Sequence, residues 1–133
     1  MEYATLSAIQ QDLAAGRIQM EQLVEGYLGR IDAHRDLNAF LQVFSDEARH
    51  RAELVASRLK NGTAGKLAGL VVAIKDNICY AGYPATAGSK ILSGYTSVYS
   101  ATVVDRLLSE DAIIIGRLNC DEFGMGSSNE NSF

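Results

Sequence analysis

Two short apolar runs, at residues 70–74 and 112–116, constrain the fold of this chain more than any other feature of its sequence. Both are rich in β-branched residues and have the length of a strand, a pattern typical of strands buried on both faces. Between them, residues 101–110 carry apolar side chains at helical spacing. Strand, helix and strand predict a right-handed crossover in an α/β fold with a covered, mixed or mainly parallel sheet.

The sequence before these runs shows helical periodicity with recognisable start and stop signals. Thr5 or Ser7 can cap a first short helix, which Gly16 is expected to end in a left-handed conformation. A second helix is predicted over residues 20–32, although its two interior glycines each cost about 1 kcal/mol relative to alanine.

A short extended segment and a third helix follow. Residues 38–44 alternate in polarity, which indicates extended backbone, and Ser45 is expected to cap a helix that Asn61 and Gly62 end. We therefore divide the chain into an amino-terminal helical region, residues 1–62, and the first part of an α/β core, residues 63–133, within one incomplete domain.

Composition excludes several classes of function. The chain has 133 residues, of which 47% are hydrophobic and 21% charged, with a net charge of −4 and no basic cluster. These values indicate a globular protein that does not wrap a nucleic-acid backbone. No apolar run approaches the ~18 residues of a membrane span, and no secretory signal is visible. Cys79 and Cys120 lack metal-ligand spacing, so we expect reduced thiols in a cytoplasmic protein.

Lys75 is the most informative polar residue. It directly follows the first apolar run, and open α/β sheets present their ligand crevice at the carboxyl ends of their strands. A lysine that acts as a base must be neutral, which requires burial or a cationic neighbour. Because side chains alternate in extended backbone, Asp76 is expected to point away from Lys75 and to bind backbone groups or another partner. The simpler interpretation is a strand-end lysine that reaches into solvent.

A polar, Gly- and Ser-rich segment, residues 119–132, follows the second apolar run and should face the same sheet edge. Its glycines allow close backbone approach, and its N–H and hydroxyl donors suit a carbonyl or a developing oxyanion. Three of its carboxylates could bind Mg²⁺, but no spaced ligand loop accompanies them, so we expect solvated or capping roles. They are Asp121, Glu122 and Glu130.

The sequence offers two possible kinds of nucleophile, and each has a simpler interpretation. Ser127 and Ser128 could act as nucleophiles, but paired serines in a polar loop are more often turn or capping residues. A Cys120 thiolate could use a histidine base, yet nothing in the sequence places His34 or His50 near it.

Five motifs in this order resemble the amidase signature family. The likeness spans the whole chain, with generic helices before residue 60 and specific motifs after it, so that residues 63–133 correspond to the first part of the α/β amidase core. The motifs occupy residues 67–78, 87–92, 101–104, 116–119 and 121–132.

The resemblance implies a Ser/cis-Ser/Lys amidase in which a neutral lysine, matching Lys75, accepts a proton from a bridging serine held by a cis peptide. That serine in turn deprotonates the nucleophilic serine, which attacks the side-chain amide of glutamine and releases ammonia. The resemblance also implies that Met125, Gly126 and Ser127 line the glutamine pocket, and that this chain holds no metal or other cofactor.

The likeness is strongest to the glutaminase components of tRNA-dependent amidotransferases. It implies that ammonia passes to a partner, the B-subunit, which uses ATP and Mg²⁺ to amidate a misacylated tRNA, and that a C-subunit completes the complex. No membrane partner is implied.

One departure from the family pattern matters. The segments with the bridging and nucleophilic serines should follow Phe133, so we expect the 133-residue chain to carry only the lysine and to be inactive alone. Two alternatives stay open. One is a non-catalytic module that binds the other amidotransferase subunits, and the other is an enzyme that uses Lys75 to form a Schiff base.

Overall fold

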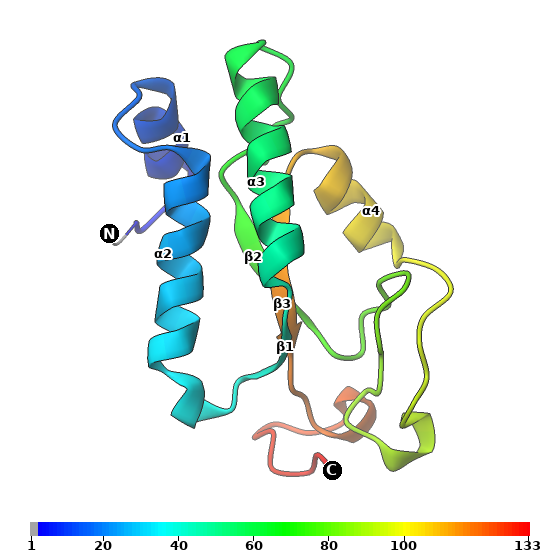
Figure 1. Ribbon diagram of the computed structural model, residues 1–133. Coiled ribbons are helices and arrows are strands. Elements are labelled where there is room, and N and C mark those ends of the chain that lie inside the picture. The colour runs from blue at the N-terminus through cyan, green and yellow to red at the C-terminus, as the bar shows by residue number, and fades with distance from the viewer. Residues whose placement is uncertain (1–2) are drawn as a thin grey trace.

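The computed structural model describes residues 3–133 and shows a three-stranded mixed sheet between helices (Figure 1). The strands are β1 (Phe40–Val43), β2 (Val71–Lys75) and β3 (Ile113–Leu118), in the spatial order β1-β3-β2. β3 runs parallel to β2 and antiparallel to β1. The central strand therefore receives the α/β crossover on one side and the amino-terminal region on the other.

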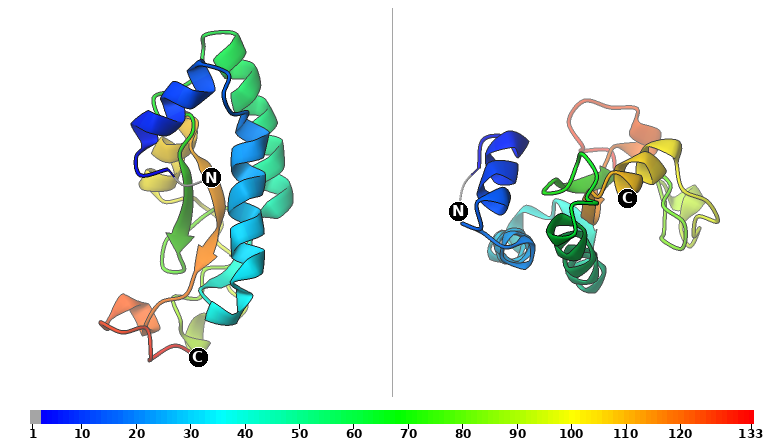
Figure 2. Two further views of the ribbon diagram at one scale, coloured as in Figure 1. Left: turned by 90° about the vertical axis from the view of Figure 1, so that its left-hand side faces the viewer. Right: turned by 90° about the horizontal axis from the view of Figure 1, so that it is seen from above.

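Within residues 3–133, four α-helices and three short 3₁₀ turns accompany the sheet. Figure 2 shows α2 and α3 against one face of the sheet and α4 on the opposite side. The helices are α1 (Leu6–Ala14), α2 (Met20–Ala33), α3 (Ser45–Lys60) and α4 (Thr102–Ser109). The 3₁₀ turns are η1 (Arg35–Leu37), η2 (Lys90–Leu92) and η3 (Glu122–Gly124).

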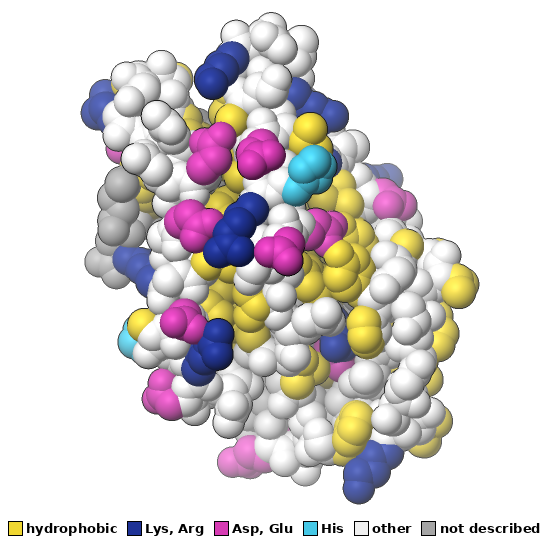
Figure 3. Space-filling view, viewed as in Figure 1, with side chains coloured by type: hydrophobic (Ala, Val, Ile, Leu, Met, Phe, Trp, Pro, Cys, Tyr) yellow, Lys and Arg dark blue, Asp and Glu magenta, His cyan; other side chains and the backbone are white. Residues whose placement is uncertain are grey.

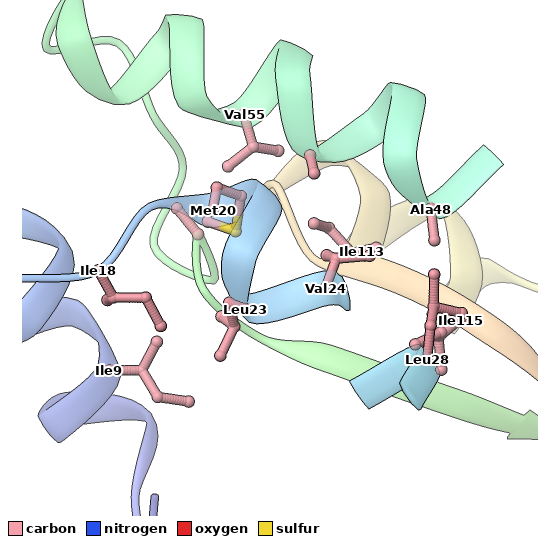
Figure 4. Packing of buried hydrophobic residues seen from close by; sticks show 12 residues of the cluster. Ile9, Ile18, Met20, Leu23, Val24, Leu28, Ala48, Val55, Ile113 and Ile115 are labelled. Atoms are coloured by element: carbon pink, nitrogen blue, oxygen red, sulfur yellow. The ribbon is translucent and has the colours of Figure 1, made fainter. Parts of the chain in front are cut away.

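Alternation along β3 divides the core into two clusters. Ile113 and Ile115 pack beneath the amino-terminal helices with residues such as Val24 and Val55 (Figure 4). Ile114 points the other way and packs with Val104 of α4. The period-2 geometry of a strand thus lets one short element join both halves of the core.

The predicted helices are confirmed, with one correction at a cap. The Thr5 hydroxyl accepts a hydrogen bond from the Ala8 backbone at 3.2 Å, and Gly16 adopts φ +67° after α1. Ser45, by contrast, is the first residue of α3 and not its cap. Phe44 takes the capping position because its ring is buried in the core, and its carbonyl accepts from the Ala48 N–H at 2.8 Å.

The burial predicted for the first apolar run is partly wrong. β3 is buried along most of its length, but β2 lies at the edge of the sheet, and Val71, Val72 and Ala73 are only half-buried. A continuous apolar pattern indicates that both faces are apolar, but it does not show whether a neighbouring strand covers the edge.

A buried carboxylate fixes α3 to the start of β3. Asp111, in the turn before β3, accepts hydrogen bonds from Arg58 of α3 at 2.5 Å and from the Gly65 N–H at 2.8 Å. Its side chain is almost fully buried. This pair lies in the turn before β3, whereas Lys75 lies at the opposite, carboxyl end of its strand.

The outer surface of the helices is polar and of mixed charge. Figure 3 shows acidic and basic side chains interspersed over α2 and α3, and Arg49 pairs there with Glu25 at 2.6 Å. Within residues 3–133, no helix has both the length and the apolar character that crossing a membrane demands.

Gly116 and Gly26 offer a matched pair of stability tests. A Cβ at Gly116 would lie 2.6 Å from the Gln42 carbonyl oxygen and 2.8 Å from the Phe40 ring, whereas one at Gly26 meets nothing within 4 Å. We expect Gly116→Ala to lower the free energy of unfolding by about 1–3 kcal/mol through overpacking. Gly26→Ala should raise it by about 0.5–1 kcal/mol, because alanine loses less entropy in a helix. Urea unfolding monitored by circular dichroism measures both, and an equal effect of the two substitutions would contradict the packing.

The outer edge of β2 gives a second prediction. Within residues 3–133 this edge has no partner strand, and its first four residues are uncharged. Unpaired edges with apolar side chains template pairing with other chains, so we expect the isolated chain to associate as its concentration rises. Sedimentation velocity over a wide concentration range measures this. A monomer throughout, with a high and cooperative melting transition, would be the contrary result.

Candidate active site

Lys75 lies at the carboxyl end of β2, at the sheet edge where β3 also ends. Its side chain is exposed, and its Nζ atom lies beside the η3 turn. A Cβ built on Gly124 would be 3.7 Å from Nζ. The structure thus brings Lys75 and the Gly/Ser-rich segment together, although residues 3–133 do not supply the burial that a neutral amine requires.

Asp76 points in the opposite sense to Lys75 and is completely buried. Its carboxylate accepts hydrogen bonds from the Thr86 hydroxyl, the Thr86 N–H at 3.2 Å and the Gly88 N–H at 3.3 Å. It also forms an ion pair with Arg117 of β3. Asp76 is expected from the sequence to bind backbone groups or another partner, and in the structure it does both.

The turn that Asp76 holds also contacts the second loop. Ala87 and Gly88 both have positive φ, +49° and +64°, and the Ala87 carbonyl accepts from the Phe123 N–H at 2.7 Å. A Cβ on Gly88 would lie 2.5 Å from the Cys120 carbonyl oxygen, so only glycine fits this approach. The Ser89 hydroxyl adds a hydrogen bond of 2.5 Å to Glu122.

Asp121 organises the Gly/Ser-rich segment from inside. Its buried carboxylate accepts from the N–H groups of Asn129 and Asn131, each at 3.0 Å. These backbone hydrogen bonds, first that from Asn131 and then that from Asn129, lower the pKa of Asp121 below its ordinary value. Gly126 lies against the same carboxylate, where a Cβ would overlap one of the oxygens. The expected solvated or capping role is therefore wrong for Asp121, because its buried carboxylate makes no cap hydrogen bond to η3 and instead binds backbone N–H groups of its own loop.

The residues predicted to bind substrate lie on the rim of this segment. Met125 is 78% exposed, Ser127 is exposed, and Gly126 rests on Asp121. Ser128 donates to Glu130 at 3.1 Å, a local turn contact. The roles of Lys75, Met125, Gly126 and Ser127 in catalysis and binding stay predictions.

The alternative nucleophile and metal arrangements are not assembled in the described part of the chain. Cys120 is buried beyond β3, whereas His34 and His50 are exposed at the end of α2 and on α3. Within residues 3–133, no group of three or more His, Cys, Asp or Glu side chains could hold a metal ion.

A hollow in the described part of the chain lies away from Lys75. It has a volume of about 570 Å³ and lies between α2, β1 and the start of α3, with Gly29, Phe40 and Arg49 among its lining residues. Lys75 is not one of them. We assign the candidate site to the Lys75 edge because the convergent polar groups are there, even though its surface is open.

Arg117 is the residue that the sequence interpretation missed. It is 6% exposed, and its guanidinium contacts Asp76 from near the carboxyl end of β3, just after the apolar run. The available signal was its position, since a charged residue next to a buried apolar run needs an oppositely charged partner.

Comparison with known proteins gives closely related sequences. The A-subunit of glutamyl-tRNA(Gln) amidotransferase from Salinibacter ruber is 50% identical, and the match covers 99% of this chain and 26% of that protein. The protein of the same name from Chlorobaculum tepidum is also 50% identical, over 99% of this chain and 28% of that protein. The chain thus spans about a quarter of the length of these curated relatives.

Solved structures share the backbone arrangement. One comes from work described as "An unexpected vestigial protein complex reveals the evolutionary origins of an s-triazine catabolic enzyme". It has 33% identity and a TM-score of 0.88, and the match covers 97% of this chain and 29% of that one. Native peptide amidase from Stenotrophomonas maltophilia has 28% identity and a TM-score of 0.81, over 90% of this chain and 25% of that one.

The family model described as Amidase matches residues 22–133. This range takes in β1, the strand that ends at Lys75, and both loops at its carboxyl end. The chain therefore belongs to the amidase family.

Proposed function

We propose that this chain is the amino-terminal part of the glutaminase component of a tRNA-dependent amidotransferase, and that Lys75 is its catalytic lysine. The relatives named as the A-subunit of glutamyl-tRNA(Gln) amidotransferase, half identical over nearly the whole chain, support this assignment. The observation that carries it is the placement of the Lys75 amine beside Gly124, with the adjacent Asp76 carboxylate turned away and neutralised by Arg117.

The proposed reaction needs no metal or other cofactor in this chain. The Lys75 amine takes the proton of a bridging serine, which takes the proton of a nucleophilic serine as that oxygen attacks the glutamine side-chain carbonyl. The carbon–nitrogen bond then breaks, and ammonia leaves with a proton returned through the same relay. Water hydrolyses the resulting glutamyl ester to glutamate and restores the serine.

The loop beside Lys75 is suited to the glutamine end of this reaction. Gly126 brings the backbone against Asp121, and Met125 and Ser127 stand at the exposed rim. We propose that Met125, Gly126 and Ser127 line the glutamine pocket. In the whole complex, ammonia would pass to the B-subunit, which uses ATP and Mg²⁺ to amidate misacylated tRNA, with the C-subunit as a further partner. This assignment places the protein in the cytoplasm.

Residue exchange at Lys75 tests the assignment. In the complete amidotransferase, Lys75→Ala should lower glutamine hydrolysis by about 10⁴-fold or more, as loss of a triad member does. Lys75→Arg should fail similarly, because a guanidinium does not give up its proton. Ammonia release from glutamine measures the effect. Lys60→Ala, at the far end of α3, is the matched control and should leave the rate unchanged.

The isolated chain gives an independent outcome. We expect the 133-residue chain to release no ammonia, because the resemblance assigns only the lysine of the triad to it. Turnover by the chain that Lys75→Ala abolishes would overturn this assignment. A pull-down in which the chain binds the B-subunit or the C-subunit, together with full activity of a Lys75→Ala enzyme, would instead favour the non-catalytic binding module.

The order of the segment beside Lys75 should depend on pH through Asp121. Because backbone hydrogen bonds depress its pKa below the ordinary 3.8, the ionised carboxylate stabilises the folded segment at all pH values above that figure. The stabilisation is lost as pH falls through the depressed pKa. The segment should therefore stay ordered at neutral and mildly acidic pH.

We predict that the amide signals of Asn129 and Asn131 shift and broaden together only below about pH 4. Asp121→Asn should remove that transition and loosen the segment at neutral pH, because an amide group offers these two N–H donors only one acceptor oxygen. Two-dimensional NMR of the chain follows both residues. Asp36→Asn, at an exposed position, is the control, and an Asp121→Asn spectrum that matches it would show that Asp121 does not hold the segment.

A further inference from the structure

We propose that the buried pair of Asp76 and Arg117 is a positioning device that sets the location of the Lys75 amine relative to the η3 turn. The inference rests on the proposed function in assigning a reaction to Lys75. The geometry on which it depends belongs to the chain itself. Neither residue touches the reacting atoms, so each acts through Lys75 and through the loop that faces it.

Asp76 connects three segments at the sheet edge. Its N–H donates to the Leu118 carbonyl at 2.9 Å, and its own carbonyl accepts from the Ala87 N–H at 3.2 Å. Its side chain binds the Thr86 and Gly88 donors described above. Because Lys75 is the preceding residue on the same strand, every restraint on Asp76 is a restraint on the backbone that carries the amine.

Arg117 holds the carboxylate from the neighbouring strand. It pairs with Ile74 in the β2–β3 register and is buried with its Nε atom lacking any hydrogen-bond partner among the described residues. Replacing a buried ion pair with apolar residues is often neutral or stabilising, so folding alone does not require this arrangement. Arg117 is buried with one guanidinium donor unsatisfied, which is unfavourable for stability. Its burial is better explained if its role is to hold the Asp76 carboxylate in place.

The restraint reaches the far side of the site through the turn that Asp76 binds. The Ala87 carbonyl accepts from the Phe123 N–H at 2.7 Å, and Phe123 lies in η3 next to Gly124. A chain of hydrogen bonds therefore runs from the Asp76 carboxylate through residues 86–88 to the turn against which the Lys75 Nζ lies. If the carboxylate is lost, both sides of the site should move apart.

Substitutions of the pair in the 133-residue chain test this directly. Asp76→Asn places an amide NH₂ against the donors on one side or the other, and Arg117→Met removes the cation with little change of volume. We expect both to abolish the NOE between the Lys75 Hε and Gly124 Hα protons. Amide exchange at residues 86–88 and 122–124 should quicken by about tenfold or more. Arg117→Lys keeps a cation opposite Asp76 and should retain the NOE.

Asp111→Asn is the matched control, because Asp111 is another buried carboxylate held by an arginine and a backbone N–H. It should lower overall stability while leaving the Lys75–Gly124 NOE intact. The proposal is overturned if Asp76→Asn keeps the NOE, or if Asp111→Asn loses it as well. Should Asp76→Asn fail to fold, Thr86→Val, which removes one donor to Asp76, replaces it. If amide hydrogen exchange at residues 122–124 is then unchanged in Thr86→Val, the proposal is overturned.

A functional readout separates this inference from the proposed reaction. In the complete amidotransferase, Arg117→Met should lower kcat by about 100-fold, the scale of a small misplacement of catalytic groups, with little change in KM for glutamine. Arg117→Lys should recover most of that loss. If Arg117→Met and Arg117→Lys lowered kcat equally, the charge of Arg117 would not be what positions Lys75. A rate insensitive to Lys75→Ala would reject the proposed function and leave the NOE result in the chain standing.

Discussion

A single buried carboxylate, that of Asp76, joins β2 to β3 and to the turn at residues 86–88, and that turn contacts the segment after β3. The carboxylate receives a cation from β3 and three donors from the turn at residues 86–88. Such a group is costly to bury unless every oxygen is bonded, and here both oxygens are. The position of the loops at this edge is therefore set by the need to satisfy one charge.

Two further buried carboxylates, at other points of the fold, are likewise satisfied by hydrogen bonds from irregular backbone. Asp121 gathers the N–H groups of the Gly/Ser-rich segment, and Asp111 ties α3 to the start of β3. In each case a short acidic side chain replaces regular secondary structure as the organiser of irregular backbone. Lys75 differs from all three, because within residues 3–133 its side chain is exposed and makes neither a hydrogen bond nor an ion pair. The Lys75 charge nevertheless acts on the neighbouring segment, because it contributes to lowering the pKa of Asp121.

Much of this architecture could be predicted because short stretches of sequence determine its strands and helices. The β-branched runs identified β2 and β3, and the place of Lys75 at a strand end predicted its approach to the segment after β3. The half-buried state of β2 could not be predicted, since it depends on strand order. The predicted cap at Ser45 was wrong because the buried ring of Phe44 sets where α3 begins. The Asp76–Arg117 pair joins residues 41 positions apart, a separation at which no local signal operates.

Position and burial of the lysine are separate requirements, and the fold meets them by separate means. The strand end and its hydrogen-bonded loops fix where the amine lies, which requires only short-range contacts and works on an open surface. Removing water from the amine requires apolar area around it, and β2, the edge strand that ends at Lys75, carries half-buried apolar side chains. Covering that edge would pair its exposed backbone groups and lower the dielectric around Lys75 in one step. Under the proposed function, a strand paired with β2 would thus both satisfy this edge and help to keep the Lys75 amine neutral.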